Sequence, residues 1–184
     1  MSFVLIRHGL TQGNLEHRYI GCRTDEPLCR QGVEALRKRN YPNVHRVFVS
    51  PMKRCAQTAA ILYPDIVPEI VCDFRECDFG AFEGLSYAEL NGREDYQRWV
   101  DSFGELPFPG GESRALFAGR CISAFDRLPP QNVGEDWALI VHGGTIMAIM
   151  QAHSRPKGDY YDFQVPCGDG YTLHSDGSFI RLCP

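Results

Sequence analysis

Phe3-Val4-Leu5-Ile6-Arg7-His8-Gly9 is the stretch that decides the fold. Four consecutive apolar residues indicate a strand buried on both faces, which is typical of the parallel sheets of α/β proteins. The run ends abruptly in an arginine, a histidine and a glycine. Because ligands of open parallel sheets bind beyond the carboxyl ends of the strands, we expect Arg7 and His8 to face a crevice. The stretch is therefore a candidate phosphate site.

Two later segments bring similar chemistry to the same edge of the predicted sheet. Residues 46–49 predict a second short strand, followed by a helical pattern over 52–63 for which Ser50 is the predicted N-cap and Pro51 the first helical residue. Arg54 then lies in the first turn of that helix, where anions are favoured. Residues 137–141 predict a third strand, which ends in His142-Gly143-Gly144. A lone histidine after a strand is more often structural, but the repeated pattern of apolar run, histidine and glycine favours a shared anion site.

The remaining pattern completes an α/β fold. Helical spacing of apolar residues predicts helices over 29–39, 114–128 and 146–151, and shorter helices over 13–18, 86–91 and 94–103. An edge strand is predicted over 66–72. A hairpin is predicted over 171–182, with its turn at Asp176-Gly177. Residues 73–113 predict an excursion that roofs the crevice. We expect one domain over 1–184, with three α/β/α layers around a mostly parallel central sheet.

Composition excludes several classes of protein. The formal net charge of -4 and the pI near 5.8 argue against a general nucleic-acid or anionic-membrane surface. No segment approaches the roughly 18 apolar residues of a membrane helix, and no leader pattern opens the chain, so we expect a cytoplasmic protein. The eight cysteines contain no CxxC pair. Free thiols are therefore favoured over the alternative of a zinc or disulfide protein.

Three carboxylates lie among three phenylalanines in the predicted roof. Glu76, Asp78 and Glu83 are mixed with Phe74, Phe79 and Phe82 over ten residues. An apolar setting disfavours the charged form of a carboxylate and raises its pKa. These carboxylates are therefore candidates for raised pKa values.

With these motifs in order, the sequence resembles the histidine phosphatase superfamily, also called phosphoglycerate-mutase-like proteins (branch 1). The matching positions span nearly the whole chain: Arg7-His8-Gly9 with Thr11 and Asn14; Gly21 with Asp25, Pro27, Leu28 and Gly32; Ser50-Pro51 with Arg54, Gln57, Thr58 and Ala59; Glu76 with Phe79-Gly80 and Glu83-Gly84; Gly110-Gly111-Glu112; and His142-Gly143-Gly144.

The resemblance implies a role for each matching residue. His8 is implied as the nucleophile that forms a phosphohistidine, and Arg7, Arg54, His142, Asn14 and the Gly143 amide as the groups that hold the phosphoryl oxygens, with Gly21 also at the substrate site. Glu76 matches the proton donor, and Asp78 and Glu83 remain its rivals. Glu112 is implied either to hold an arginine of the pocket or to cap the following helix, a role that Ser113 fills equally well. The resemblance implies no metal and no cofactor.

Phosphatase and mutase members share this apparatus. The chain is compact and lacks the basic tail of glycolytic mutases, which favours a phosphatase acting on a small phosphorylated metabolite, and its loops look most like those of alpha-ribazole phosphatases of cobalamin biosynthesis and broad-specificity bacterial relatives. Cys29 and Met147 depart from the usual pattern, in which a threonine or serine and, in many relatives, an arginine are found. Mutase-type transfer and a non-catalytic phospholigand-binding domain are the alternatives. We expect a monomer or homodimer.

Overall fold

The computed structural model describes residues 1–182, and its centre is one six-stranded sheet in the order β3-β2-β4-β1-β5-β6. Strands β1 (Ser2–Arg7), β4 (Asp136–Val141), β2 (Arg46–Val49) and β3 (Glu69–Ile70) run parallel. Strand β5 (Gly170–His174) pairs antiparallel with β1, and β6 (Phe179–Arg181) pairs antiparallel with β5. The carboxyl ends of β1 and β4 therefore lie side by side, with Arg7 paired to Val141.

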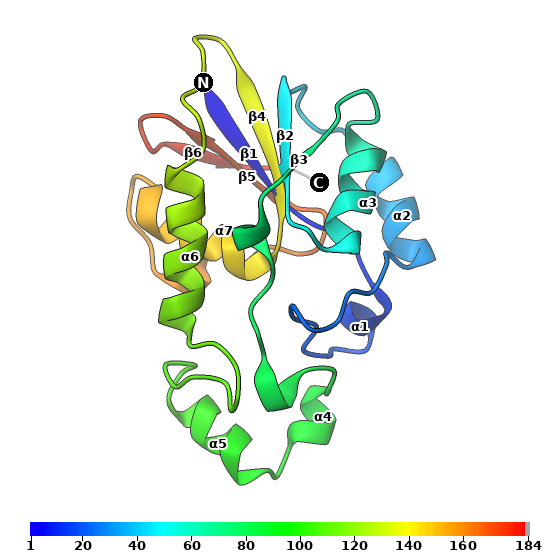
Figure 1. The fold of residues 1–184 in the computed structure, drawn as a ribbon, viewed down its shortest axis with the longest axis vertical. Helices are drawn as coiled ribbons and strands as arrows, with labels where there is room; N and C mark the ends of the chain where they lie inside the picture. Colours follow the sequence, from blue (N-terminus) through cyan, green and yellow to red (C-terminus); the bar gives the residue numbers. More distant parts are fainter. Residues whose placement is uncertain (183–184) are drawn as a thin grey trace.

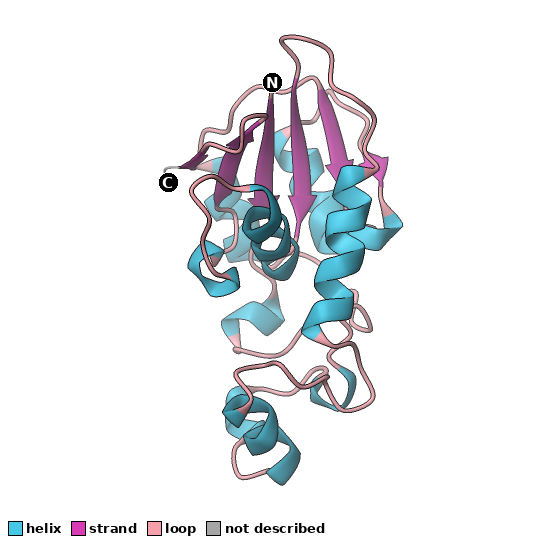
Figure 2. Cartoon of the chain, turned by 90° about the vertical axis from the view of Figure 1, so that its left-hand side faces the viewer, coloured by secondary structure: helices cyan, strands magenta, loops and turns pink. Residues whose placement is uncertain are grey.

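Alternate residues of the central strands fill two separate cores. Leu5 and Leu139 face the layer of helices α6 (Arg114–Asp126) and α7 (Gly143–His153), while Ile6 and Ile140 face α3 (Lys53–Leu62) on the other side of the sheet. Helix α2 (Arg30–Arg37) packs against α3, as Figure 1 shows at the right of the sheet. Figure 2 shows the sheet with helices on both faces. The predicted three-layer α/β/α fold with a mostly parallel sheet is confirmed.

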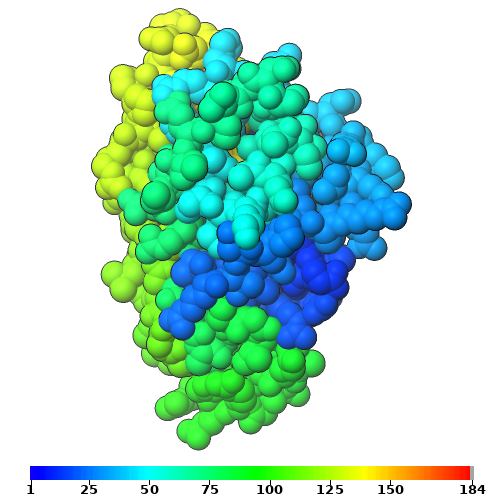
Figure 3. Space-filling model, turned by 45° about the vertical axis from the view of Figure 1, so that its right-hand side comes forward, coloured from blue at the N-terminus to red at the C-terminus, as the bar shows by residue number. Residues whose placement is uncertain are grey.

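The segment between β3 and α6 leaves the sheet. It contains the 3-10 turns Cys72–Phe74 and Gly80–Phe82 and the short helices α4 (Tyr87–Leu90) and α5 (Glu94–Asp101). In Figure 1 α4 and α5 lie beyond the ends of the parallel strands. The loop after α1 (Gln12–Leu15) packs on this segment through backbone hydrogen bonds of Tyr19 with Gly84 and Leu85, and Figure 3 shows the blue and green surfaces in contact. The predicted excursion thus forms a cap, and the N-terminal loop packs against it.

Three local predictions are wrong in their details. Helix α3 begins at Lys53 after Met52, and Ser50 does not cap it because its hydroxyl is engaged by His142. The predicted edge strand over 66–72 is reduced to Glu69–Ile70, paired with β2, because Pro68 cannot donate to a ladder and the chain turns at Cys72. Helix α7 starts at Gly143, earlier than the apolar spacing predicts, so His142 is its N-cap residue.

Other boundaries are close to the predictions. Ser113 caps α6 by accepting from the Leu116 amide, and the helix ends before Pro129. The Cys29 sulfur accepts from the Gly32 amide at the start of α2, so this cysteine keeps the capping role that a threonine or serine would have. The cysteines within residues 1–182 are free thiols, and Cys183 lies outside the described residues. Across the same 182 residues, every helix is too short or too polar to cross a bilayer.

Candidate active site

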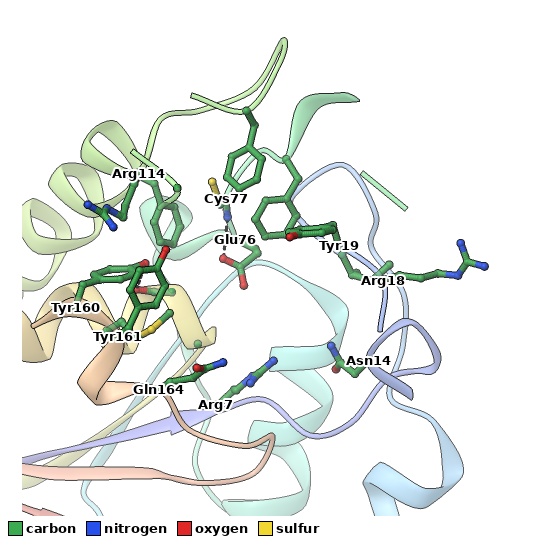
Figure 4. A pocket seen from close by; sticks show the side chains of 18 of the residues that line it. Arg7, Asn14, Arg18, Tyr19, Glu76, Cys77, Arg114, Tyr160, Tyr161 and Gln164 are labelled. Atoms are coloured by element: carbon green, nitrogen blue, oxygen red, sulfur yellow. Dashed lines mark hydrogen bonds between the residues drawn. The ribbon is translucent and has the colours of Figure 1, made fainter. Parts of the chain in front are cut away.

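A cavity of about 260 Å³ lies between the carboxyl ends of β1 and β4 and the cap. Figure 4 shows Arg7 and Asn14 at its base, with Glu76 above them and aromatic side chains around it. The lining combines the strand ends, the loop after α1, the cap, the start of α7 and the 3-10 turn Tyr160–Phe163. Segments far apart in sequence therefore converge on one space, as the parallel topology requires.

His8 is held in one tautomer. Its ring lies at the end of β1, and Nδ1 is 2.7 Å from the carbonyl oxygen of Gly9. Because a carbonyl can only accept, Nδ1 carries the proton and Nε2 keeps its lone pair. Burial, together with the charges of Arg54 and Arg7, holds the pKa of His8 well below its ordinary value. His8 is thus a neutral imidazole whose free nitrogen is available as a nucleophile.

His142 lies next to His8. The two rings meet edge to face with centroids 5.2 Å apart, and His142 Nε2 is 2.8 Å from the Ser50 hydroxyl. Its Nδ1 has no hydrogen-bond partner among residues 1–182 and lies 3.6 Å from Glu76 Oε2. Burial and the charge of Arg54 also lower the pKa of His142 well below its ordinary value. The unpartnered nitrogen therefore faces Glu76, although His142 is buried behind the residues that line the cavity.

Arg7 and Arg54 carry positive charge without a counter-ion. Arg7 donates to the Val165 carbonyl at 2.7 Å, and Arg54 donates to the carbonyls of Thr24 and Gly21 at 3.0 and 3.2 Å. No carboxylate within residues 1–182 forms an ion pair with either guanidinium, and the Nε atoms of both are buried without a partner. A buried cation is costly unless paired. Two of them near one cavity indicate a site built for an anion with two charges.

Glu76 is the carboxylate that the structure places at the cavity. Its Oε1 accepts from the Cys77 amide, and burial raises its pKa. Asp78 lies outside the cavity and forms an ion pair with Arg23 at 2.7 Å; partial burial works against it, but the hydrogen bond from Arg23 leaves the pKa of Asp78 lowered. Glu83 accepts from the Gly21 amide at 2.9 Å and braces the loop. Of the three rivals, only Glu76 combines a cavity position with a raised pKa.

Arg120 of α6 holds the segment that carries Glu76. Its guanidinium donates to the carbonyls of Asp73, Arg75 and Glu76 at 2.7, 2.7 and 3.0 Å. Both Glu112 oxygens accept from it at 2.8 Å, and Glu112 Oε2 also accepts from the Asp78 amide. Glu112 therefore holds an arginine, as one of the two predicted roles has it, although this arginine lies behind the cavity.

The remaining predicted residues divide into two groups. Asn14 lines the cavity; its Oδ1 accepts from the amide and the hydroxyl of Thr11, which turns its NH₂ group toward the cavity, and Gly143 lines it at the first turn of α7. Gly21 does not line it. A Cβ on Gly21 would lie 2.3 Å from the Cys77 carbonyl oxygen, so glycine allows the loop to pass close to the cap.

The sequence reasoning missed several residues of the site. Arg120 follows Phe117 by three residues on the buried side of α6, and an arginine at a core-facing position is the signal that marks it. Tyr160, Tyr161, Gln164 and Arg114 line the cavity from segments without a motif. No group of three metal-ligating side chains is found within residues 1–182.

Comparison with known proteins agrees with this geometry. The metal-independent phosphoserine phosphatase of Arabidopsis thaliana is 32% identical over 160 residues, covering 80% of this chain and 66% of that protein. The adenosylcobalamin/alpha-ribazole phosphatase of Escherichia coli is 25% identical over 196 residues, covering 99% of this chain and 94% of that protein. The crystal structure of phosphoglycerate mutase from Thermus thermophilus superposes with a TM-score of 0.77 at 28% identity, covering 100% of this chain and 99% of that one.

The profile of the histidine phosphatase superfamily (branch 1) matches residues 3–180, from the first strand to the last. Phosphatases and mutases are both found among the similar proteins. With the paired histidines and the two unpaired arginines beneath the cap, the chain belongs to the histidine phosphatase superfamily.

Proposed function

We propose that the protein hydrolyses phosphomonoesters through a phosphohistidine on His8, without a metal ion. The observation that carries the proposal is the hydrogen bond from His8 Nδ1 to the Gly9 carbonyl, which leaves Nε2 unprotonated beside two unpaired arginines. In the first step Nε2 attacks phosphorus, an N–P bond forms and the P–O bond to the alcohol breaks. In the second step water attacks phosphorus and the N–P bond breaks, which releases inorganic phosphate and restores His8.

The two arginines supply the positive charge that stabilises the transition state of phosphoryl transfer. Charge spreads over the equatorial phosphoryl oxygens in the transition state, so positioned positive charge and hydrogen-bond donors stabilise it. Arg7, which lines the cavity, and Arg54, whose charge acts on His8, provide the charge, and the Asn14 amide and the Gly143 N–H provide further donors at the cavity. No step in this scheme requires a divalent ion.

Glu76 donates a proton in the first step and accepts one in the second. Its raised pKa keeps the carboxyl group protonated at a higher pH than that of a free glutamate, so it can donate to the leaving alkoxide. The carboxylate formed in the first step then accepts a proton from the attacking water. Each proton taken from Glu76 is thereby returned within one cycle.

Charge pairing in the cavity supports hydrolysis over mutase-type transfer. A mutase must also bind a sugar acid, whose carboxylate calls for a further cation. Besides Arg7, the cavity is lined by Arg18 and Arg114, and both are already paired: Arg18 lies 2.7 Å from Glu16 and from Glu89, and Arg114 pairs with Glu105. Apart from the arginines of the phosphate site, no free cation for a second acid lines the cavity within the described residues.

The natural substrate is proposed to be a small phosphorylated metabolite. Alpha-ribazole phosphate is one candidate, supported by the similarity of the loops and by the relative from Escherichia coli. Phosphoserine is another, supported by the relative from Arabidopsis, although its carboxylate would meet no free cation beyond the phosphate site within the described residues. A panel of these esters with sugar phosphates and phosphoglycerates distinguishes them by kcat/KM.

The test of the proposed function uses an aryl phosphate in the presence of a chelator. We expect turnover without added metal, and after rapid acid-free quenching a phosphoenzyme that survives base and is lost in acid, as a phosphohistidine is. His8→Ala should remove both signals. Full activity in His8→Ala, or activity that the chelator abolishes, would contradict the proposal.

A further inference from the structure

The cavity above the phosphate site is walled by aromatic rings on two sides. On the cap side are Tyr19, Phe79, Tyr87, Trp99 and Phe108; on the opposite side are Phe117, Tyr160 and Tyr161. Figure 4 shows Tyr160 and Tyr161 on one side of Glu76 and Tyr19 on the other, with Arg7 below. A substrate bound by its phosphate at the base must extend its alcohol between these two walls.

The rings are fixed in place by contacts with one another. Trp99 stacks on Phe108 with centroids 4.8 Å apart and planes 29° apart, and the Phe108 ring packs edge to face on Phe79 at 4.9 Å. At Gly104, which has a positive φ, a Cβ would lie 3.0 Å from the Tyr161 hydroxyl and 3.2 Å from the Trp99 ring. This close approach joins the two walls at one end of the cavity, so the walls are preformed.

The positive charges of this upper part are neutralised. Arg18 is held by Glu16 and Glu89, and Arg114 pairs with Glu105 while its guanidinium lies over the rings of Tyr160 and Tyr161 at 5.6 and 5.7 Å. Met147 adds a thioether to the wall. An anionic group placed here would have to displace an existing carboxylate, whereas a flat apolar group would meet ring faces and sulfur.

The cavity is large enough for an aromatic ring of the substrate. A cavity of about 150 Å³ accommodates benzene in other proteins, and this one has about 260 Å³, which leaves space for the phosphoryl group as well. Gln164 and the tyrosine hydroxyl groups offer neutral hydrogen-bonding groups at the margin. The site therefore has one dianion position and one aromatic position.

From this arrangement we infer that the substrates are phosphomonoesters whose alcohol carries a planar aromatic or heteroaromatic group and no second acidic group. The inference rests on the proposed phosphatase function and narrows its substrate class. Trp99 and Tyr161, one from each wall, are the specificity-determining residues. Each stacking contact corresponds to about a 2- to 10-fold effect on binding.

The test compares three esters of primary alcohols, whose leaving groups are chemically similar: 2-phenylethyl phosphate, glycerol 1-phosphate and 3-phosphoglycerate. We expect kcat/KM for 2-phenylethyl phosphate to exceed that for glycerol 1-phosphate by about tenfold or more, since more than one ring contacts it. We expect 3-phosphoglycerate to fall at or below glycerol 1-phosphate. A kcat/KM for 3-phosphoglycerate equal to or above that of the phenyl ester overturns the inference.

Variants assign the preference to the walls. Trp99→Ala and Tyr161→Ala should each lower the ratio of phenyl ester to glycerol ester by about 2- to 10-fold, and because Tyr161 is 51% exposed its truncation keeps the test usable if Trp99→Ala fails to fold. Val100→Ala is the matched control: it lies on the same helix as Trp99, does not line the cavity, and should leave the ratio unchanged. A ratio that neither wall variant moves overturns the assignment.

Failure of the inference differs from failure of the proposed function. Equal turnover of all three esters with a detectable phosphoenzyme overturns the substrate class alone. Absence of turnover for these esters and for an aryl phosphate, with no phosphoenzyme, overturns both.

Discussion

Replacing Arg120 with methionine should disable proton donation while leaving the nucleophile intact. The variant removes three hydrogen bonds to the carbonyls of residues 73, 75 and 76 and the paired contacts with Glu112. Side chains of this pair are 14% and 18% exposed, so loss of the cation costs about 3 kcal/mol, at the low end for a buried pair. With a typical stability of about 5–15 kcal/mol, the protein should still fold.

The kinetic effect follows from the position of Glu76. A displacement of about 1 Å in a catalytic group costs on the order of 100-fold, and general acid catalysis is worth about 10²- to 10⁴-fold in total. We therefore expect kcat for an alkyl phosphate to fall by about 10- to 100-fold. Hydrolysis of p-nitrophenyl phosphate, whose leaving group needs little protonation, should fall less than about threefold, because Arg120 does not touch His8.

Three controls make the assay decisive. Arg127→Met removes an ion pair to the side chain of Asp73 from the exposed end of the same helix and should leave both substrates unaffected. Arg120→Lys should restore part of the alkyl phosphatase activity. Adding Arg120→Met to Glu76→Gln should cause no further loss, since both act on one proton transfer. Equal losses on both substrates, or additive losses in the double variant, would refute the reasoning.

Three further predictions concern the site itself. In the proposed mechanism, activity on alkyl phosphates requires neutral His8 and protonated Glu76. Burial lowers the pKa of His8 and raises that of Glu76, so kcat/KM should persist well below pH 6.5 and decline as pH rises through the pKa of Glu76. Glu76→Gln should remove that decline. Ser50→Ala removes the 2.8 Å contact with His142. It should lower kcat about tenfold, measured by stopped assay, and the free energy of unfolding by about 1–2 kcal/mol, measured by denaturant titration. An unchanged kcat would contradict this role of Ser50. Met147→Arg should place an unpaired cation on the cavity wall and raise kcat/KM for 3-phosphoglycerate relative to glycerol 1-phosphate by about tenfold; no change in that ratio would argue that the wall does not select against acids.

The sequence predicts the parts of the fold that local pattern determines. The sequence predicts where the strands before Arg7 and His142 end, because the buried apolar runs stop abruptly there. It also predicts that the two ends lie together, because parallel strands end at one edge of the sheet. The sequence also predicts the N-cap at Ser113, because an N-cap depends only on residues within one helical turn. Ser50 shows where this reasoning stops: its hydroxyl serves as well for a cap as for a distant histidine, and only the pairing of β2 with β4 decides between them.

The upper part of the cavity could not be predicted for the same physical reason. Trp99 and Tyr161 come from segments that share no strand pairing, and no periodicity relates them. Their approach depends on how the cap packs on the 3-10 turn, which long-range contacts determine. Arg120 was missed because a charged residue on a helix is usually solvated, whereas this one is surrounded by carbonyl groups of the cap.

The position of β1 in the sheet has a consequence for synthesis of the protein. Ser2–Arg7 is made well before its two neighbours in the sheet, β4 and β5, with Ser2 opposite Asp136 and His174. Pairings of such long sequence separation form slowly, because loop closure precedes any gain from contact. On the ribosome the segment that carries His8 must therefore remain apolar and unpaired until both of these strands have emerged, and transient protection of this segment by a chaperone would favour a high yield of folded protein.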